Sequence, residues 1–396
     1  QEQPNVRAAL TWLSGPDGAV DQALEMAGSL GLFWHLGRHL EGREVLQRLL
    51  ALGGSKEARA HALQAVSIVE RPRGCLVHPS TLCAETAQES LDMFDGEGDD
   101  SRAALSKVLL AVEGVTGADP ERSEALLAEA EQQFRADSDD WGLGVIGFVR
   151  METALKTGHL DTAIAVGRAA AAQFRQLDDY WGLSAILYHL GWGLRQFGRN
   201  EEGAHDLEEA IDVAASAGLY NTVQWAFADL GVTQLHLGER AAAHDAFDRA
   251  RAASEHVGDG AGSILAGYGY GLLAHTDGDW RDARPRYADA IDGFAQLGTP
   301  VPQGLALAGL ARCDEAEGDL SSAGQRYEQV LDTGRRMGEQ SLTAMALEGL
   351  ARLAAGRGDD RTAHRLAAEA TRVRATSRRP APPHERRDME GLLPVG

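Results

Sequence analysis

The apolar positions of this chain repeat with a period of forty, and each copy has the spacing of two helices that pack against each other. The first half of a copy carries a large residue followed by a small one, at Leu190-Gly191, Leu230-Gly231, Tyr270-Gly271, Leu310-Ala311 and Leu350-Ala351. The second half carries small residues with a bulky one between them, as in Ala243, Phe247 and Ala250. Residues three, four and seven apart share one face of a helix, so the small residues permit close approach and the bulky one fills the gap. The pattern therefore predicts a helix A and a helix B in every copy.

Glycines mark the ends of the two predicted helices. Six of them, here called the turn glycines, recur with this period between helix A and helix B: Gly158, Gly198, Gly238, Gly278, Gly318 and Gly358. Four more, here called the cap glycines, follow helix B with the same spacing: Gly218, Gly258, Gly298 and Gly338. Glycine makes up 46 of the 396 residues, so a single match has a chance of about one in nine and six in register indicate a true repeat. Glycine suits a helix C-terminus, where a left-handed residue is needed.

The repeat is less regular toward the N-terminus. Gly117 precedes Gly158 by one position more than the period, and Gly37 precedes Gly117 by twice the period, which leaves room for one degenerate copy with its turn near Arg71 to Pro79. We expect about nine helix pairs in an all-α, right-handed superhelix, that is, a solenoid. Four segments are predicted: 1–52, an N-terminal helical repeat; 53–116, degenerate repeats; 117–376, regular repeats; and 377–396, an extended tail.

Composition and charge narrow the possible partners. The chain is 44% hydrophobic but only 6% aromatic, which favours helix over a β-sandwich. Its net charge of -21 repels phosphate backbones, so neither direct nucleic-acid binding nor binding to an anionic membrane is expected. Cysteine is sparse and odd in number, there is no signal-peptide pattern, and no apolar run has the length of a membrane span. These features indicate a cytoplasmic protein.

Two groups of residues resemble metal sites, and both fit a structural role better. His35 and His39 are four residues apart, but Gly37 between them ends the predicted helix, so the two side chains do not share a face. Cys75, His78 and Cys83 lack a second pair that would complete four ligands, so buried thiols are the better interpretation. We therefore expect no metal.

Two further motifs resemble cofactor or ion loops. The string Gly267–Gly271 (GYGYG) falls inside helix A, whereas a dinucleotide loop needs a strand before it and a helix after it. The acidic loop Asp95–Asp100 (DGEGDD) lacks the central Gly and the final Glu of a calcium loop. No Ser/His/Asp or Cys/His set is placed by the repeat so that a nucleophile meets a base. We expect no catalytic residue and no cofactor.

The helix pairs resemble tetratricopeptide (TPR) repeats, although the usual TPR period is shorter, at roughly 34 residues. The longer period is similar to that of the TPR-like superhelix in MalT-type bacterial regulators. The N-terminal runs NVRAALTW, GLFW and LEGR, in residues 5–12, 31–34 and 40–43, resemble the junction that opens the TPR region in large ATP-binding regulators of the LuxR family and in AfsR-like regulators. The run PPHER, in residues 382–386, resembles the segment that follows such repeats.

This resemblance implies an ATPase module of the STAND class (signal-transducing ATPases) before residue 1. The chain contains neither a G-x-x-x-x-G-K-[ST] phosphate loop nor a helix-turn-helix with a basic recognition face. It also begins at Gln1 rather than at Met, which indicates a segment of a longer protein.

In a TPR superhelix, helix A lines the concave face, which is the usual place for a ligand. Counting from the large-small pairs, we predict that the groove is lined by Tyr188, Trp192, Arg195, Trp225, Tyr268, His275, Arg312 and Glu315, with Leu272, Glu348 and Arg352 on the same face. A groove that is aromatic at first and charged toward the C-terminus suits a partly apolar ligand or an amphipathic peptide. The alternative is that the Trp and Tyr side chains only fill gaps between successive helix pairs.

The favoured hypothesis is the ligand- or protein-binding sensor region of a cytoplasmic STAND-type transcriptional regulator. Its groove would hold a small-molecule inducer or a partner protein and so bias an adjacent ATPase domain of the same polypeptide. The alternative is a free-standing TPR adaptor that holds two proteins together, and an enzyme is a distant third. Assembly into a homo-oligomer stays open.

Overall fold

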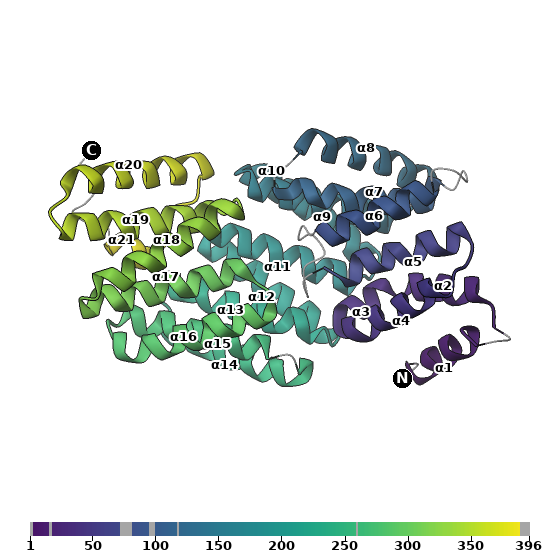
Figure 1. Cartoon of the computed structure of the whole chain (residues 1–396), viewed down its shortest axis with the longest axis horizontal. Coiled ribbons are helices and arrows are strands. Elements are labelled where there is room, and N and C mark those ends of the chain that lie inside the picture. The colour runs from purple at the N-terminus through teal and green to yellow at the C-terminus, as the bar shows by residue number, and fades with distance from the viewer. Residues whose placement is uncertain are drawn as a thin grey trace. The chain divides into compact units, whose positions relative to one another are not determined.

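The computed structural model describes residues 3–15, 18–71, 81–94, 100–116, 119–258 and 260–388. All regular secondary structure in these ranges is helical, which confirms the predicted all-α solenoid of helix pairs (Figure 1). The chain divides into two compact units, one made of residues 1–156 and 161–183 and the other of residues 157–160 and 184–396. Among the described helices, none combines the length and the hydrophobicity needed to cross a membrane.

The first unit starts with short helices and continues with longer pairs. Its helices are α1 (Gln3–Leu13), α2 (Val20–Ser29), α3 (Gly31–Gly37), α4 (His39–Ala51), α5 (Lys56–Val69), α6 (Thr81–Phe94), α7 (Asp100–Ala111), the 3-10 helix η1 (Val112–Thr116), α8 (Pro120–Asp137), α9 (Asp140–Lys156) and α10 (Leu160–Gln176). As predicted, the helix that carries His35 ends at Gly37, and His39 begins the next one. Asp119 caps α8 by accepting a hydrogen bond from the Arg122 backbone N–H at 3.0 Å.

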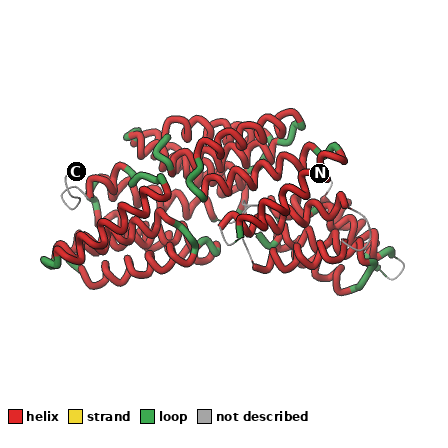
Figure 2. Tube along the Cα trace, turned by 90° about the horizontal axis from the view of Figure 1, so that it is seen from above, coloured by secondary structure: helices red, strands yellow, loops and turns green. Residues whose placement is uncertain are grey.

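The second unit consists of regularly alternating A and B helices joined by short turns (Figure 2). They are α11 (Tyr180–Gln196), which the unit boundary divides after Leu183, α12 (Asn200–Ser216), α13 (Tyr220–Leu237), α14 (Arg240–Val257), α15 (Ala261–Thr276), α16 (Trp280–Leu297), α17 (Pro300–Glu317), α18 (Leu320–Arg336), α19 (Gln340–Gly356), α20 (Asp360–Ser377) and α21 (Pro383–Asp388). The A helices α13, α15, α17 and α19 also contact one another in turn. We call the surface that these A helices share the A face.

The turns between these helices have the backbone conformation that the glycine pattern predicts. All six turn glycines and all four cap glycines have positive φ, for example 85° at Gly238 and 68° at Gly298. At Gly238 the chain then reverses, and the N–H of Glu239 donates to the carbonyl of Gln234 at 2.8 Å. This bond satisfies a carbonyl at the end of α13 that has no partner within the helix.

The left-handed conformation of the cap glycines also occurs at the equivalent position of repeats that have another residue there. Ser138, Asp178 and Arg378 have φ of 55°, 52° and 55°, and they lie in the same register of the repeat as Gly218 and Gly338. A side chain in this left-handed region costs about 1 kcal/mol or more, which is why glycine is the usual residue. The repeat is therefore more regular in backbone than in sequence.

Bulky rings of the B helices lie directly on glycines of the A helices. A Cβ atom added to Gly231 or to Gly269 would lie 2.4 or 2.3 Å from the ring of Phe247, so the side chain of Phe247 occupies the place of theirs. Tyr287 is held in the same way between Gly271 and Gly309. The packing role predicted for the large-small pairs is confirmed at these positions, and so is that of Gly269 and Gly271 in the GYGYG string inside α15.

In the first unit, Trp141 and Trp181 pack against each other. Their ring centroids are 6.4 Å apart, and the indole N–H of Trp141 donates to Asp179 at 2.9 Å. These tryptophans are forty residues apart, at equivalent positions of successive repeats, and both have a packing role. Cys83, in the same unit, is buried.

The end of the chain differs from the extended tail predicted for residues 377–396. Ser377 still belongs to α20, and Pro383–Asp388 form the short helix α21. Pro382 precedes this helix and Pro383 is its first residue, because proline is well tolerated in a first helical turn.

Several other predictions fall outside the described residues. They concern Cys75, His78, Gly117, most of the turn between Arg71 and Pro79, and the acidic loop up to residue 99.

Candidate functional site

A small cavity lies on the A face of the second unit. Its volume is about 40 Å³, and its walls come from α15, α17 and α19, with contributions from the B helices α16 and α18 and from α21. Three of the predicted groove residues line it, namely Tyr268, His275 and Arg312. Leu272, Glu348 and Arg352, which were assigned to the same face, line it too.

Aromatic rings form the apolar wall of this cavity. The ring of Tyr268 lies 6.0 Å from that of Tyr287 and 6.2 Å from that of Phe294. Nδ1 of His275 lies 3.2 Å from the hydroxyl of Tyr287, and its ring packs against Trp280 with centroids 4.8 Å apart. Burial raises the pKa of both Tyr268 and Tyr287 well above the usual value, so both phenols stay neutral.

A network of arginines and glutamates lies beside these rings, with the guanidinium groups of Arg312 and Arg352 each 5.8 Å from the ring centroids of Trp280 and Tyr327, respectively. Arg312 and Arg352 both pair with Glu315, and the N···O distance from Arg352 is 3.4 Å. Arg352 also donates a hydrogen bond to the hydroxyl of Tyr327 at 3.0 Å. These are largely buried groups, since only 10% of the Glu315 side chain and 16% of the Arg352 side chain is exposed. Planar guanidinium groups held in this way are suited to binding carboxylates.

Next to this network, Arg374 of α20 connects two carboxylates. Its Nε and Nη2 donate to Glu348 at 2.6 and 2.8 Å, and Nη2 also donates to Glu385 of α21 at 2.8 Å. Burial raises the pKa of Glu385 to about 7, and the nearby charge of Glu348 adds to the rise, whereas Arg374 and Arg352 oppose it. The cost of removing this carboxyl group from water thus exceeds what the arginines return.

A second polar set on the A face joins α11 to α13. The hydroxyl of Tyr188 donates to Asp229 at 3.0 Å, and Arg195 forms an ion pair with the same carboxylate. Nε of Arg195 is buried and has no hydrogen-bond partner among the described residues. Trp192 lies on the same helix face as Tyr188 and Arg195 and is half-buried.

The structure therefore distributes the predicted residues over two neighbouring sets. Tyr268, His275 and Arg312 line the cavity, with Glu315 in the network beside it, whereas Tyr188 and Arg195 converge on Asp229. Trp225 packs against the hydrophobic core of the second unit, as Tyr188 and Tyr268 also do in part. Asp229, Arg374 and Glu385 were not predicted; the only sequence signal for any of them is the PPHER run that contains Glu385.

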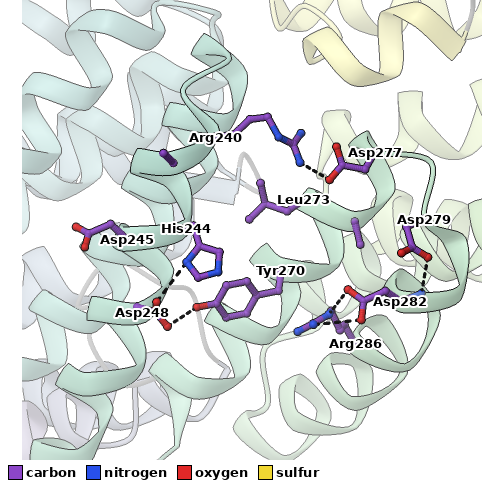
Figure 3. A pocket seen from close by; sticks show the side chains of 12 residues that line it. Arg240, His244, Asp245, Asp248, Tyr270, Leu273, Asp277, Asp279, Asp282 and Arg286 are labelled. Atoms are coloured by element: carbon purple, nitrogen blue, oxygen red, sulfur yellow. Dashed lines mark hydrogen bonds and ion pairs between the residues drawn. The ribbon is translucent and has the colours of Figure 1, made fainter.

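A larger, open pocket is formed mainly by B helices and has a different character. Its volume is about 710 Å³, and it lies between the B helices α14 and α16, with one wall from α15 (Figure 3). Tyr270 donates to Asp248 at 2.6 Å, and Arg286 pairs with Asp282 at 2.9 Å. None of the predicted groove residues lines this pocket. Its arginines are paired with aspartates of the chain itself, which is typical of a solvated outer surface.

Comparison with known proteins identifies the fold but no family. No protein-family model matches the sequence, and no curated protein matches it significantly. A Rap protein complexed with competence and sporulation factor is similar in structure, with a TM-score of 0.65 and 12% identity over 85% of this chain and 92% of that one. The Rap conjugation gene regulator of plasmid pLS20, in complex with the Phr* peptide, has a TM-score of 0.53 and 14% identity over 95% and 98% of the two chains.

Aspartyl phosphate phosphatase F from Bacillus subtilis has the same overall arrangement, with a TM-score of 0.57 and 10% identity over 91% of this chain and 96% of that one. At such low identities the likeness defines the fold alone. The chain has the fold of a TPR-like helical-repeat protein.

Proposed function

We propose that this chain is the sensor region of a cytoplasmic, STAND-type transcriptional regulator and that it binds its ligand on the A face of the second unit. The observation that carries the proposal is the convergence of Tyr268, His275 and Arg312 on one cavity, beside a network of buried arginines. Neutral aromatic rings together with guanidinium groups suit a partly apolar molecule with a negative end. The aromatic rings and guanidinium groups of the described lining favour binding as the role of this arrangement.

Two similar structures are named as complexes with a competence and sporulation factor and with the Phr* peptide. They favour a peptide over a small-molecule inducer as the occupant of the groove. Binding would then bias an adjacent ATPase domain, and through it a DNA-binding domain, of the same polypeptide.

The complete gene tests the regulatory role directly. We expect it to encode a phosphate-loop ATPase domain ahead of Gln1. A gene without such a domain would contradict the role of a STAND sensor and favour the free-standing TPR adaptor.

Replacing Trp192 by alanine should remove bound ligand without unfolding the chain. Trp192 shares a helix face with Tyr188 and Arg195, and truncating a central aromatic side chain costs binding at least about tenfold. The measurement is the amount of ligand that co-purifies with the full-length protein from its own host, determined by mass spectrometry. Trp12→Ala is the matched control, because Trp12 is 69% exposed on α1. Equal ligand in both variants, or a matching loss of helicity in Trp192→Ala, would show that Trp192 does not serve binding.

A further inference from the structure

The C-terminal segment, residues 378–388, folds back over the second unit instead of leaving it. Arg378 is in the left-handed conformation that reverses the chain after α20. Arg379 then pairs with Glu339 at 2.7 Å, and both side chains are almost fully buried. The guanidinium group of Arg379 also lies 5.7 Å from the ring centroid of Phe197, at the far end of the unit's sequence. We call this stretch the returning segment.

Close contacts with turn glycines hold the start of the returning segment. A Cβ atom on Gly198 would lie 3.1 Å from Pro380, and one on Gly158 would lie 3.2 Å from the carbonyl oxygen of Ser377. The segment therefore lies against turns of the first helix pairs of the unit as well as against the last ones. Helix α21 follows and places Glu385 in the wall of the cavity.

Glu385 completes the charges around the cavity. Of the described side chains there, the repeat helices supply three arginines, Arg312, Arg352 and Arg374, but only two glutamates, Glu315 and Glu348. The third carboxylate comes from the returning segment, through its hydrogen bond with Arg374. The returning segment thus brings a third carboxyl group to a site where the repeat helices supply three arginines and two glutamates.

We propose that the returning segment is a built-in occupant of the ligand groove, and that the external ligand is an acidic peptide whose carboxylate displaces Glu385 from Arg374. This inference rests on the function proposed above and specifies how the same site is regulated. The internal occupant is itself a peptide, and its anchoring group is the carboxyl group of Glu385, which hydrogen-bonds to Arg374. A ligand that binds to the same surface is therefore expected to be a peptide that also presents a carboxyl group.

The returning segment has the properties of an occupant that can be displaced. Helix α21 is only six residues long, and Arg386 next to Glu385 is exposed. Burial of Glu385 is unfavourable enough to raise its pKa, so its contact with Arg374 adds little net stability. An external peptide can form the same hydrogen bond with Arg374, and its occupancy of the groove follows its concentration.

A peptide with the sequence of residues 378–388, added in trans, tests the proposal. In the full chain carrying Glu385→Lys, the new charge opposes Arg374 and Arg352, so the internal segment should leave the groove. The fluorescently labelled peptide should then bind that chain at least about tenfold more tightly than it binds the wild type, because a tethered competitor acts at millimolar effective concentration. The same peptide carrying Glu385→Lys should not bind.

Glu328→Lys is the matched control, because Glu328 is exposed on α18 and makes the same change of charge there. This variant should bind the peptide as weakly as the wild type does. If Glu385→Lys lowers helicity, Glu385→Ala replaces it, since that change removes the carboxylate without adding a charge. Equal binding to all chains, or no binding to a variant with native circular dichroism, overturns the proposal. Either result leaves the Trp192→Ala measurement unaffected, so the ligand groove itself is tested separately.

Binding of this peptide should weaken as the pH rises. The buried carboxyl group of Glu385 has a pKa of about 7, above its ordinary 4.5, so the bound form holds its proton more tightly than the free form. Binding is then strongest below pH 4.5 and loses strength up to about pH 7, on the order of tenfold between pH 5.5 and 8.

The pH dependence of binding that comes from Glu385 must be distinguished from that of the other ionisable groups around it. Glu385 faces Arg374 of α20 and Glu348 and Arg352 of α19, and His275 of α15 lines the same cavity. A peptide carrying Glu385→Gln leaves all of these groups unchanged and should show no such pH dependence. A similar dependence for both peptides would assign the titration to His275 or to the peptide's own His384.

Discussion

Phe247→Ala should lower the free energy of unfolding of the second unit by about 3–5 kcal/mol, because it removes a fully buried ring and leaves a cavity. Phe247 is the bulky residue of its repeat and lies between Gly231 of α13 and Gly269 of α15. Loss of the Phe247 ring therefore disrupts packing against two successive A helices, α13 and α15, rather than within one helix pair. Urea unfolding followed by circular dichroism measures the change, and Phe33→Ala, at a position that is 44% exposed, is the control.

Gly269 provides a second test of the same contact. In the wild type, Gly269→Ala should destabilise the unit strongly, because its Cβ would lie 2.3 Å from the ring of Phe247. In the background Phe247→Leu the same change should cost less, since the ring is gone. The difference between the two costs is the coupling energy of the contact. If Gly269→Ala lowers stability equally in both backgrounds, the packing of the Phe247 ring does not require a glycine at position 269.

Arg374→Met should cost about 3 kcal/mol, because it leaves the buried carboxylates of Glu348 and Glu385 without the cation that joins them. The side chains of Arg374, Glu348 and Glu385 are exposed by only 13%, 8% and 13%, so water does little to screen their charges. We expect the last helix pair and α21 to lose hydrogen-exchange protection first, since repeats depend mainly on their neighbours.

Two further variants show whether the charge is responsible. Arg336→Met removes an arginine that is 65% exposed and should change stability by less than about 1 kcal/mol. Combining Arg374→Met with Glu348→Met should recover part of the loss, because a buried pair is then replaced by apolar side chains. A double variant less stable than Arg374→Met alone would contradict this account.

The repeat could be predicted from sequence because its determinants are local. A glycine with positive φ or a small residue beneath a ring is required at one position whatever the rest of the chain does, as at Gly238 and Gly231. Where another residue takes the left-handed conformation, as at Ser138 and Asp178, the same turn leaves no mark in the sequence. The first unit was less predictable for this reason.

The candidate site was predictable only where it depends on the repeat. Tyr268, His275 and Arg312 follow from counting along an A helix, and they line one cavity. Arg374 and Glu385 do not follow from any count, because their positions depend on the fold-back of the C-terminal segment. Arg374 lies on a B helix, which the repeat assigns to the opposite surface, yet it reaches Glu348 of α19. Contacts between residues that are far apart in the chain leave no periodic pattern in the sequence.

The returning segment also changes the mechanics of the second unit. In a linear array each helix pair contacts only its neighbours, so the two ends of the array move independently. Here Arg379 touches both Phe197 and Glu339, so one side chain ties an early pair to a late one. Such a tie restrains extension of the unit, together with the close approach of Pro380 to Gly198 and the hydrogen bond between Arg374 and Glu385. Release of the segment would therefore lower the stiffness of the entire unit.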